Sequence, residues 1–535
     1  MIQFITNMAN IFQHVRVRKP KSNMFNLGHS LKLSTNMGVM TPILCMPVVP
    51  RDRIKDTAEI FVRFAPMLAP LMHSVKVYTH FFFVPNRIAM KQDQWEAYIT
   101  KGEEGTSTQE IPYTTVAALN SAGLWTIGGL ADYFGLPVQQ PVAGNDTTPI
   151  SLLPFLAYQK IWNDYYRDQN LQAENPDLVV DGGLITESSV LRSIFAMHNR
   201  AWEKDYFTSA LPFVQRGEPT VIGIGDRAEV KLSESPLSSQ QIWKNGDNTG
   251  PLETGEAQFV EESGITTIQS VNLPGNLDPN GTMYADLSKA TAIDIVDLRT
   301  ANKVQEWKEK NSRFGSRYIE QILAHFGVKS SDARLQRPEY LGGGFSDVVF
   351  DAVFQTSQTT ADSPLADFAG QGASAQVTHQ FNRFFEEHGY IIGIMTVMPK
   401  TGYYQGIPRD FMKIDSMDWY WPSFAHLAEQ PIFNSELYVG TNQTNPQGTF
   451  GYTPRYAEYK YMPDRVAGHF RTDLDYWHLA REFSTPPQLN GNFIECKPST
   501  RIFNVTDETV EHLYCQVRHH LIARRPMPKY GTPYW

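Results

Sequence analysis

The chain has 535 residues, of which 41% are apolar and 12% aromatic, with 37 glycines, 34 prolines and a formal net charge of −9. This composition is typical of a globular protein with many turns and long loops, and it argues against a helical bundle or a disordered chain. The negative total also excludes a protein that is basic over its whole surface.

Neither a membrane span nor a secretory signal is predicted. The longest apolar run, residues 390–399, has about half of the roughly 20 residues that a membrane helix requires, and the first twelve residues lack a positive segment and a small-residue cleavage site. The three cysteines, Cys45, Cys496 and Cys515, show no CxxC spacing. We therefore expect buried free thiols, no zinc site, and no cofactor.

Charge is distributed unevenly along the chain. The first acidic residue is Asp52, and nothing after Glu511 is acidic, whereas acids outnumber bases between Glu218 and Lys289. Basic ends can neutralise nucleic-acid phosphates, although solvated tails remain an open alternative. The candidate nucleic-acid-binding residues are Arg16, Arg18, Lys19, Lys21, Arg518, Arg524, Arg525 and Lys529.

Four segments, taken in chain order, have the pattern of strands. Residues 27–33 and 73–84 alternate apolar with polar side chains, although 73–84 turns apolar on both faces near its end. Residues 390–399 are almost continuously apolar, as expected of a strand that is covered on both faces. Residues 512–523 alternate again, with Leu513, Cys515 and Val517 on one side and Arg518 on the other.

Because these strands lie far apart in sequence, neighbours in a sheet must be joined by long connections. A sandwich whose first and last strands come from the two chain ends fits a jelly roll better than a βαβ fold. Between the strands, residues 150–170 have a helical pattern, residues 217–290 form an acidic excursion, and residues 355–376 form a loop of small residues that is expected to be flexible. None carries a convincing core of its own, so a single domain over 1–535 is predicted.

No catalytic motif is present. The sequence lacks GxSxG and HExxH, and Gly342–Gly344 is not followed by the residues of a phosphate-binding loop. Residues 316–326 have helical spacing and end at Gly327. Arg334, Arg337 and Pro338 then predict a rigid basic loop, after which the glycines allow a tight turn. We interpret the whole stretch as a structural element and predict no catalytic residue.

Residues 450–471 interleave tyrosines with cations. This pattern suits stacking on single-stranded bases and equally a protein–protein interface, of which we favour the interface. The candidate subunit-contact residues are Arg334, Arg337, Arg455, Tyr456, Tyr459 and Tyr461.

Four long stretches carry a resemblance to a known family. Residues 25–43, 63–88, 316–343 and 451–471 are similar, in the same order, to the major capsid proteins of the gokushovirus branch of the Microviridae, phages with circular single-stranded DNA. The likeness covers the chain except for 217–295 and 355–376, where the family itself varies.

The resemblance implies an eight-stranded antiparallel jelly roll with large loop insertions, and sixty copies that close into a T=1 icosahedral shell in the host bacterial cytoplasm. It further implies an internal scaffolding protein, a small basic DNA-binding protein and a host cell-surface receptor as partners, with the insertion at 217–295 protruding at the three-fold axes. A basic N-terminal arm over 1–24 would then suit the inner surface.

Two other classes of protein compete with this interpretation. A carbohydrate-binding or carbohydrate-cleaving β-sandwich would show an aromatic platform beside paired carboxylates, and a phage spike would form trimers rather than closed shells. The ordered family stretches favour the capsid protein.

Overall fold

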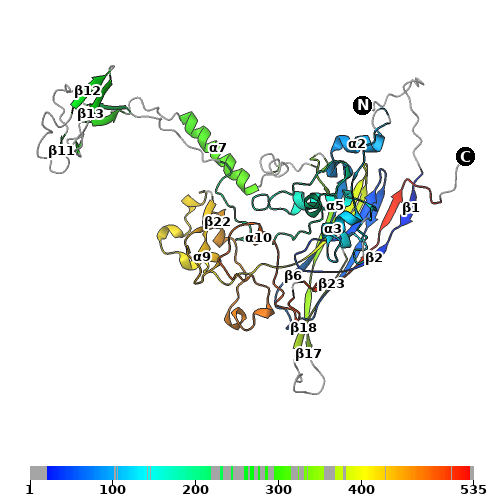
Figure 1. Ribbon diagram of the computed structural model, residues 1–535. Helices are drawn as coiled ribbons and strands as arrows, with labels where there is room; N and C mark the ends of the chain where they lie inside the picture. The colour runs from blue at the N-terminus through cyan, green and yellow to red at the C-terminus, as the bar shows by residue number, and fades with distance from the viewer. Residues whose placement is uncertain are drawn as a thin grey trace, which may run out of the picture. The chain divides into compact units, whose positions relative to one another are not determined.

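The computed structural model describes residues 21–530, except for 102–103, 105, 141–142, 145, 218–228, 233–242, 245–257, 263–264, 270–274, 277–282, 287–294, 315–322, 324–330, 334, 355–367, 378–380, 428 and 508. The chain divides into two compact units, Met1–Val214 together with Ser312–Trp535, and Gln215–Asn311. The first unit holds a β-sandwich (Figure 1).

One sheet of the sandwich, here called the open sheet, consists of antiparallel strands from both ends of the chain. Its order is β17 (Val349–Phe354), β18 (Phe368–Val377), β5 (Ala58–Phe64), β23 (Leu513–His519) and β2 (His29–Thr35). A second ladder continues four of these strands in the same order, namely β19 (Phe381–Phe384), β4 (Arg53–Asp56), β24 (Ile522–Arg525) and β1 (Asn23–Asn26). The first and last strands are therefore neighbours, as predicted.

The other sheet, here called the covered sheet, has the order β16 (Glu339–Asp347), β6 (Val75–Pro85), β20 (Gly389–Pro399) and β3 (Thr41–Val48). All of its neighbouring strands are antiparallel, and β6 pairs with β20 from Val75–Pro399 to Pro85–Gly389. Sheet neighbours thus come from distant parts of the chain, which is the connectivity of a jelly roll. The predicted all-β, jelly-roll fold class is confirmed.

The two sheets bury their side chains differently. In β20, Ile391 and Met395 point into the core between the sheets, whereas Ile392 and Ile394 pack into a second core beneath helices. The strand is therefore buried on both faces, which explains its continuous apolar sequence. In β23, buried and exposed residues alternate strictly, so only one face of that strand is covered.

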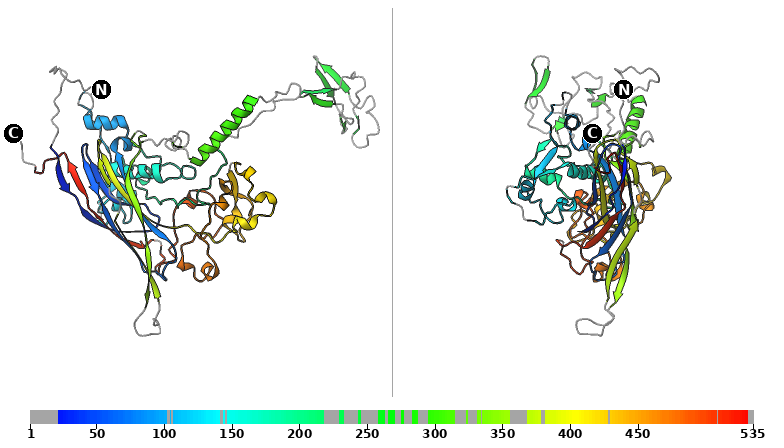
Figure 2. Two further views of the ribbon diagram at one scale, coloured as in Figure 1. Left: turned by 180° about the vertical axis from the view of Figure 1, so that it is seen from behind. Right: turned by 90° about the vertical axis from the view of Figure 1, so that its right-hand side faces the viewer.

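Helices cover the outer face of the covered sheet, and the right panel of Figure 2 shows them gathered on one side of the strands. They are α1 (Asn86–Ala89), α2 (Gln92–Thr100), α3 (Val116–Ser121), α4 (Leu130–Tyr133), α5 (Leu153–Ile161), the π-helical turn η1 (Trp162–Tyr166) and α6 (Ser188–Ile194). A small sheet of β7 (Pro112–Thr115), β8 (Pro149–Ser151) and β9 (Gly183–Leu184) lies among them in sequence. The helix predicted within 150–170 is confirmed over 153–166.

Residues 400–500, here called the lobe, have a small core of their own around Ile432, Leu437 and Phe493. The lobe consists mainly of loops tied by short elements. These are η4 (Arg409–Met412), η5 (Ser416–Asp418), η6 (Pro422–Phe424), β21 (Glu429–Phe433), α9 (Asn434–Leu437), β22 (Thr449–Pro454), η7 (Ala457–Tyr459), η8 (Gly468–Arg471), η9 (Asp475–Trp477) and α10 (Gly491–Ile494).

The described residues of the second unit form three nested antiparallel strand pairs and most of one long helix. The pairs are β10 (Glu229–Leu232) with β15 (Met283–Asp286), β11 (Trp243–Lys244) with β14 (Gly275–Asn276), and β12 (Gln258–Glu262) with β13 (Ile265–Gln269), and the helix is α7 (Ile295–Phe314). The sequence predicted only an aperiodic excursion here, and it missed these pairs because each strand is short.

Several sequence predictions need correction. Gly342–Gly344 form no tight turn but lie in β16, where Gly342 sits at a bulge with φ of +150° and a Cβ on Gly343 would lie 2.2 Å from the Thr79 carbonyl oxygen. The predicted flexible loop 355–376 is too long, because Phe368–Val377 form β18. Cys45 is exposed on the edge strand β3, whereas Cys496 and Cys515 are buried as predicted.

Other predictions fall on residues outside the described ones. These are the helix over 316–326, Arg334, and the arm up to residue 20. Asn23 and Met24, at the end of the predicted arm, already belong to β1.

Candidate nucleic-acid interface and assembly surface

The solvent-exposed side of the open sheet and of the ladder that continues it, here called the open face, collects cations from five strands. Between β5 and β23, the strand register places Arg63 opposite Tyr514 and Glu59 opposite Arg518. In the ladder that continues this sheet, Arg53 of β4 lies opposite Arg524 of β24. The exposed cations of this face are Lys32, Arg53, Lys55, Arg63, Arg518 and Arg524. Glu59 is the one carboxylate that β1, β2, β4, β5, β23 and β24 contribute to it, and it contacts Arg518 and His520 at 3.9 and 3.0 Å.

Exposed rings and aliphatic chains lie between these cations. Phe61 stands one row from Arg63 on β5, Tyr514 lies on β23, and Phe384 lies opposite Arg53 on β19. Met24 and Ile522 add exposed apolar area on β1 and β24. Cations that track a phosphate backbone, interleaved with rings on which bases can stack, are the features of a surface that binds single-stranded nucleic acid. The arrangement is therefore a candidate nucleic-acid interface.

The four C-terminal candidate cations do not share one environment. Arg518 and Arg524 are exposed on the open face. Arg525 points the other way, where only 16% of its side chain is exposed, and its guanidinium lies 3.4 Å from the Asp52 carboxylate and donates to the Pro47 carbonyl at 2.8 Å. Arg525 is thus a structural residue of this unit. Lys529 is exposed, 5.7 Å from the ring of Tyr530.

Asp52 explains why Arg525 is held inward. Its carboxylate is fully buried and accepts the Val49 backbone N–H at 3.1 Å. Burial raises the pKa of Asp52, while the Val49 N–H and the Arg525 guanidinium act in the opposite direction. Of the N-terminal candidates, Lys21 is exposed, and Arg16, Arg18 and Lys19 lie outside the described residues.

Arg337 lies in the loop that precedes β16 and is engaged within its own chain. Its guanidinium stacks 4.0 Å from the centre of the Tyr165 ring and lies 3.3 Å from the Asp332 carboxylate. The Tyr165 hydroxyl donates to the Pro338 carbonyl at 2.5 Å. These contacts hold Arg337 and Pro338 against Tyr165, and Arg337 is mostly buried by its own unit.

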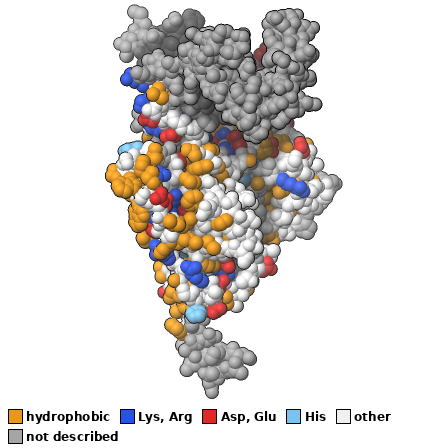
Figure 3. All heavy atoms as spheres, turned by 90° about the vertical axis from the view of Figure 1, so that its left-hand side faces the viewer, with side chains coloured by type: hydrophobic (Ala, Val, Ile, Leu, Met, Phe, Trp, Pro, Cys, Tyr) orange, Lys and Arg blue, Asp and Glu red, His pale blue; other side chains and the backbone are white. Residues whose placement is uncertain are grey.

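The lobe presents a cluster of exposed large apolar side chains, here called the aromatic patch. Its members are Phe411, Ile414, Met417, Trp419, Tyr420, Trp421, Leu427, Tyr459 and Met462, with Ile414 93% exposed. Figure 3 faces the side on which α9 and β22 lie in Figure 1, and hydrophobic side chains gather there in broad groups with few charges between them. Large exposed apolar patches mark interaction surfaces in soluble proteins.

Tyr456 holds the aromatic patch in place. Its ring is only 3% exposed, its hydroxyl donates to the Trp419 carbonyl and accepts the Trp421 backbone N–H, both at 3.3 Å, and Trp421 Nε1 donates to Ser416 at 2.9 Å. The Lys413 ammonium lies 3.8 Å from the centre of the Tyr459 ring and 2.7 Å from Asp410. The patch is therefore a preformed surface rather than a loose loop.

The candidate contact residues of the lobe divide accordingly. Tyr459 is exposed within the patch, whereas Arg455 and Tyr461 are half-buried. Arg455 stacks 5.0 Å from the Tyr456 ring, and burial raises the pKa of Tyr461 to about 12. Tyr456 supports the surface from beneath, and the interface role of the other residues stays a prediction.

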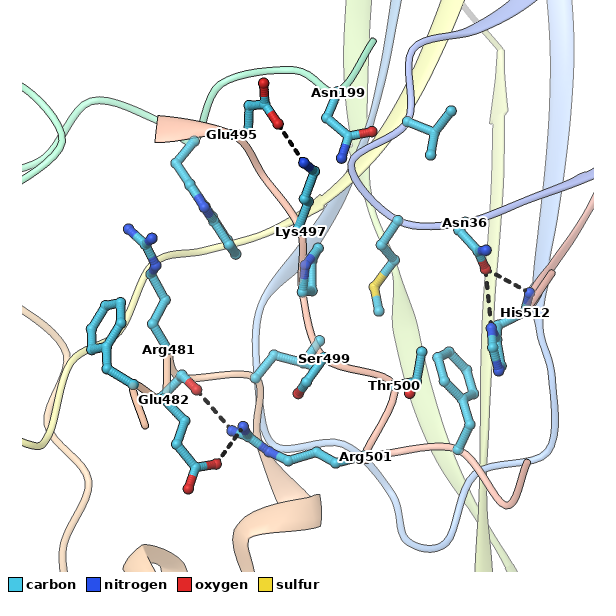
Figure 4. Close-up of a pocket in the computed structure, with 18 of the residues that line it drawn as sticks. Asn36, Asn199, Arg481, Glu482, Glu495, Lys497, Ser499, Thr500, Arg501 and His512 are labelled. Atoms are coloured by element: carbon cyan, nitrogen blue, oxygen red, sulfur yellow. Dashed lines mark hydrogen bonds and ion pairs between the residues drawn. The ribbon is translucent and has the colours of Figure 1, made fainter. Parts of the chain in front are cut away.

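A cleft of ≈ 700 Å³ lies where the lobe meets the β2–β3 turn (Figure 4). Its polar groups pair with one another. Arg501 contacts Glu482 at 3.3 Å and donates to the Ala480 carbonyl at 2.8 Å, Lys497 pairs with Glu495 at 2.6 Å, and Asn36 accepts two bonds from His512 at 3.0 Å. Several polar groups of the cleft are thus paired within the chain.

Within the described ranges, no group of three or more His, Cys, Asp or Glu side chains is placed to hold a metal ion. In the same ranges, every helix is too short or too polar to cross a membrane.

The sequence missed most of the open face. Arg53, Lys55 and Arg63 were not singled out, because their segment lies next to acidic residues and reads as an ordinary alternating stretch. The alternation over 53–64 was the available signal, since it predicts two strands with one exposed face.

Comparisons with known proteins agree over nearly the whole chain. Residues 13–535 match the family described as "Capsid protein (F protein)". The chain is 32% identical to the capsid protein VP1 of Chlamydia phage 1, with 98% of each chain covered. It is 34% identical to the capsid protein VP1 of Bdellovibrio phage phiMH2K and 33% identical to that of Spiroplasma virus 4, with at least 94% of each chain covered.

Proposed function

The chain belongs to the phage capsid (F) protein family, and from this premise we propose that its copies close into a T=1 shell around circular single-stranded DNA, with the open face turned toward the genome. It is a major capsid protein of a phage virion. Sixty copies, an internal scaffolding protein and a small basic DNA-binding protein complete the proposed assembly.

The observation that carries this proposal is the composition of the open face. The chain as a whole is acidic, yet six cations and one carboxylate stand on the strands of this face described above. Each phosphate contact would release condensed counterions, and this term supplies most of non-specific nucleic-acid affinity. An outward orientation would leave the cations without polyanionic partners.

The aromatic patch supports subunit association. A rigid cluster of Trp, Tyr, Phe and Met is typical of the energetic centre of a protein interface. Repeated contacts of this kind can each be modest, because closure of the shell makes them cooperative. In this proposal the 217–295 insertion faces outward at the three-fold axes and meets the host receptor.

The test uses particles made with the natural scaffold. Sedimentation after nuclease treatment, with an assay of the protected nucleic acid, should give a fast, uniform species that contains single-stranded DNA. The double variant Arg518→Gln/Arg524→Gln should still form shells but protect several-fold less DNA. The matched control Lys91→Gln/Lys101→Gln removes two exposed cations that flank α2, away from the open face. Equal DNA content in both variants would contradict the inward orientation.

A further inference from the structure

β17 is an edge strand with one free side. It pairs with β18 through six residue pairs, from Val349–Ala373 to Phe354–Phe368. β5 pairs only with the other part of β18, from Ala373 to Val377. β17 and the first part of β18 therefore project from the sandwich as a two-stranded ribbon, which is visible at the bottom of Figure 1. Among the described strands, none pairs with the far side of β17.

This edge lacks the usual protection against pairing. Natural edge strands carry lysine, proline or a bulge that discourages the approach of another strand. The sequence of β17, VFDAVF, has neither lysine nor proline, its one charge is Asp351, and its pairing with β18 is regular. Val349 and Val353 are 62% and 49% exposed. Such a strand is a template for a further strand.

The ribbon is held in a pairing-competent shape. Phe350 packs edge-on against Phe64 of β5 at 5.3 Å, and the Met67 and Gly370 backbones exchange two hydrogen bonds of 3.2 and 3.1 Å. A Cβ on Gly370 would lie 2.1 Å from the Ala69 carbonyl oxygen, and one on Gly372 would lie 2.6 Å from the Phe350 ring. The glycines allow this close packing, so the edge is ordered before any partner arrives.

We propose that β17 pairs antiparallel with β17 of a second copy across a two-fold axis through Ala352, so that two open sheets become one continuous sheet. This inference rests on the proposed function and specifies one of the shell's contacts. β-Strand addition of this kind obtains its affinity from backbone hydrogen bonds and its register from side chains.

The sequence of β17 favours a copy of itself as the partner. With the axis at Ala352, Phe350 lies opposite the partner's Phe354, and Asp351 lies opposite the partner's Val353. Aromatic cross-strand pairs are stabilising, whereas an axis at Asp351 would set two carboxylates directly opposite each other. The charge pattern of the strand thus selects one register.

The symmetry also fits the open face. A two-fold axis perpendicular to a sheet keeps each face on its own side, so the cations of both copies would line the same surface. The joined sheet would present the cations of both copies to the genome on either side of the seam, where the two Asp351 side chains lie on the same face. A two-fold axis in the plane of the sheet would instead turn one of the two open faces over.

Cysteine cross-linking in intact particles tests the register. Ala352→Cys places two thiols opposite each other on the axis, within the Cα separation of about 4.4–6.8 Å that a disulfide requires. Asp351→Cys is the matched control, because its Cα atoms would be about 8 Å apart given the strand rise and spacing. After mild oxidation, a denaturing gel without reductant should show covalent dimer for Ala352→Cys, at least tenfold above Asp351→Cys and the native chain.

Three outcomes would overturn the pairing. They are no dimer from Ala352→Cys, equal dimer from both variants, and dimer from Asp351→Cys alone. Particles that sediment normally and protect DNA without the cross-link would leave the proposed function intact and reject only this contact.

A second pair of variants covers a failure of the cysteine variants to assemble. Val353→Asp would set a second carboxylate directly opposite the partner's Asp351 and should lower particle yield at least tenfold while the subunit stays folded, and Val353→Thr should assemble normally. Normal assembly of Val353→Asp would reject the proposed edge contact.

Discussion

The two sheets of the sandwich share one core but differ on their outer faces. Helices bury the outer face of the covered sheet, including Phe82, Ile392 and Ile394. The open sheet leaves cations and rings in solvent on its outer face. The covered sheet, which is buried on both faces, mainly stabilises the subunit. The open sheet keeps one exposed face for contacts with partners.

The largest expected effect distinguishes the two outer faces directly. Ile392→Ala empties space in a fully buried site and should lower the free energy of unfolding by about 3 kcal/mol. Phe61→Ala removes a larger side chain from the open face and should cost less than about 0.5 kcal/mol. Urea unfolding of the subunit measures both. Similar losses would mean that the open face is packed within the subunit.

Adjacent arginines at the end of the open sheet provide the next test. Arg525→Met would leave the buried Asp52 carboxylate without its cation and should cost about 2 kcal/mol of unfolding free energy. Arg524→Met should be nearly neutral, since Arg524 is exposed. Adding Asp52→Asn to Arg525→Met should restore part of the loss. Without such a rescue, the ion pair would not explain the effect.

Acid should destabilise the first unit through two partly buried histidines. Burial lowers the pKa of His80 and of His198 to about 4. The unfolded imidazole takes up a proton below about pH 6.5, so the unfolded state binds more protons between pH 6.5 and 4. The free energy of unfolding should therefore decrease as the pH is lowered through this window, by between about 1 and 2 kcal/mol per histidine at pH 5. The contribution of these two histidines should not change further below pH 4. His198→Gln should flatten the measured pH profile, and an unchanged profile would refute this origin.

The smallest expected effect concerns salt. Single-stranded DNA binding should weaken linearly in a plot of log K against log salt concentration, and each lost phosphate contact should reduce the slope by about 0.7. Arg518→Gln/Arg524→Gln should therefore reduce the slope by about 1.4, measured with an oligonucleotide and dissociated subunits. Lys91→Gln/Lys101→Gln should leave the slope unchanged, and an equal reduction would place the DNA contact elsewhere.

Much of the fold could be predicted, because its strands carry strong local patterns. The alternation in 512–523 and the continuous apolar run in 390–399 appear as β23 and β20, with the expected burial. Gly342–Gly344 were misassigned because glycine suits both tight turns and close strand packing, and only the approach of β6 decides between them. The ribbon strand β18 was missed because its glycines and alanines carry little strand propensity.

The candidate surfaces were less predictable than the fold. Arg524 and Arg525 are adjacent and identical in sequence terms, yet one is exposed on the open face and the other pairs with buried Asp52. Tyr456 and Tyr459 belong to one tyrosine-rich segment, but only Tyr459 reaches solvent. The side toward which a side chain points depends on neighbours that are distant in the chain. A local sequence pattern does not contain this information.

By itself the sequence determined the class of the protein, since hydrophobic alternation fixes which segments become strands and the ordered family stretches identify the capsid lineage. Only the tertiary structure decided which cations meet on one face, which aromatic residues are exposed and which strand edge stays unpaired. The physical reason is that burial and strand register are collective properties, set by segments hundreds of residues apart, such as β2 and β23.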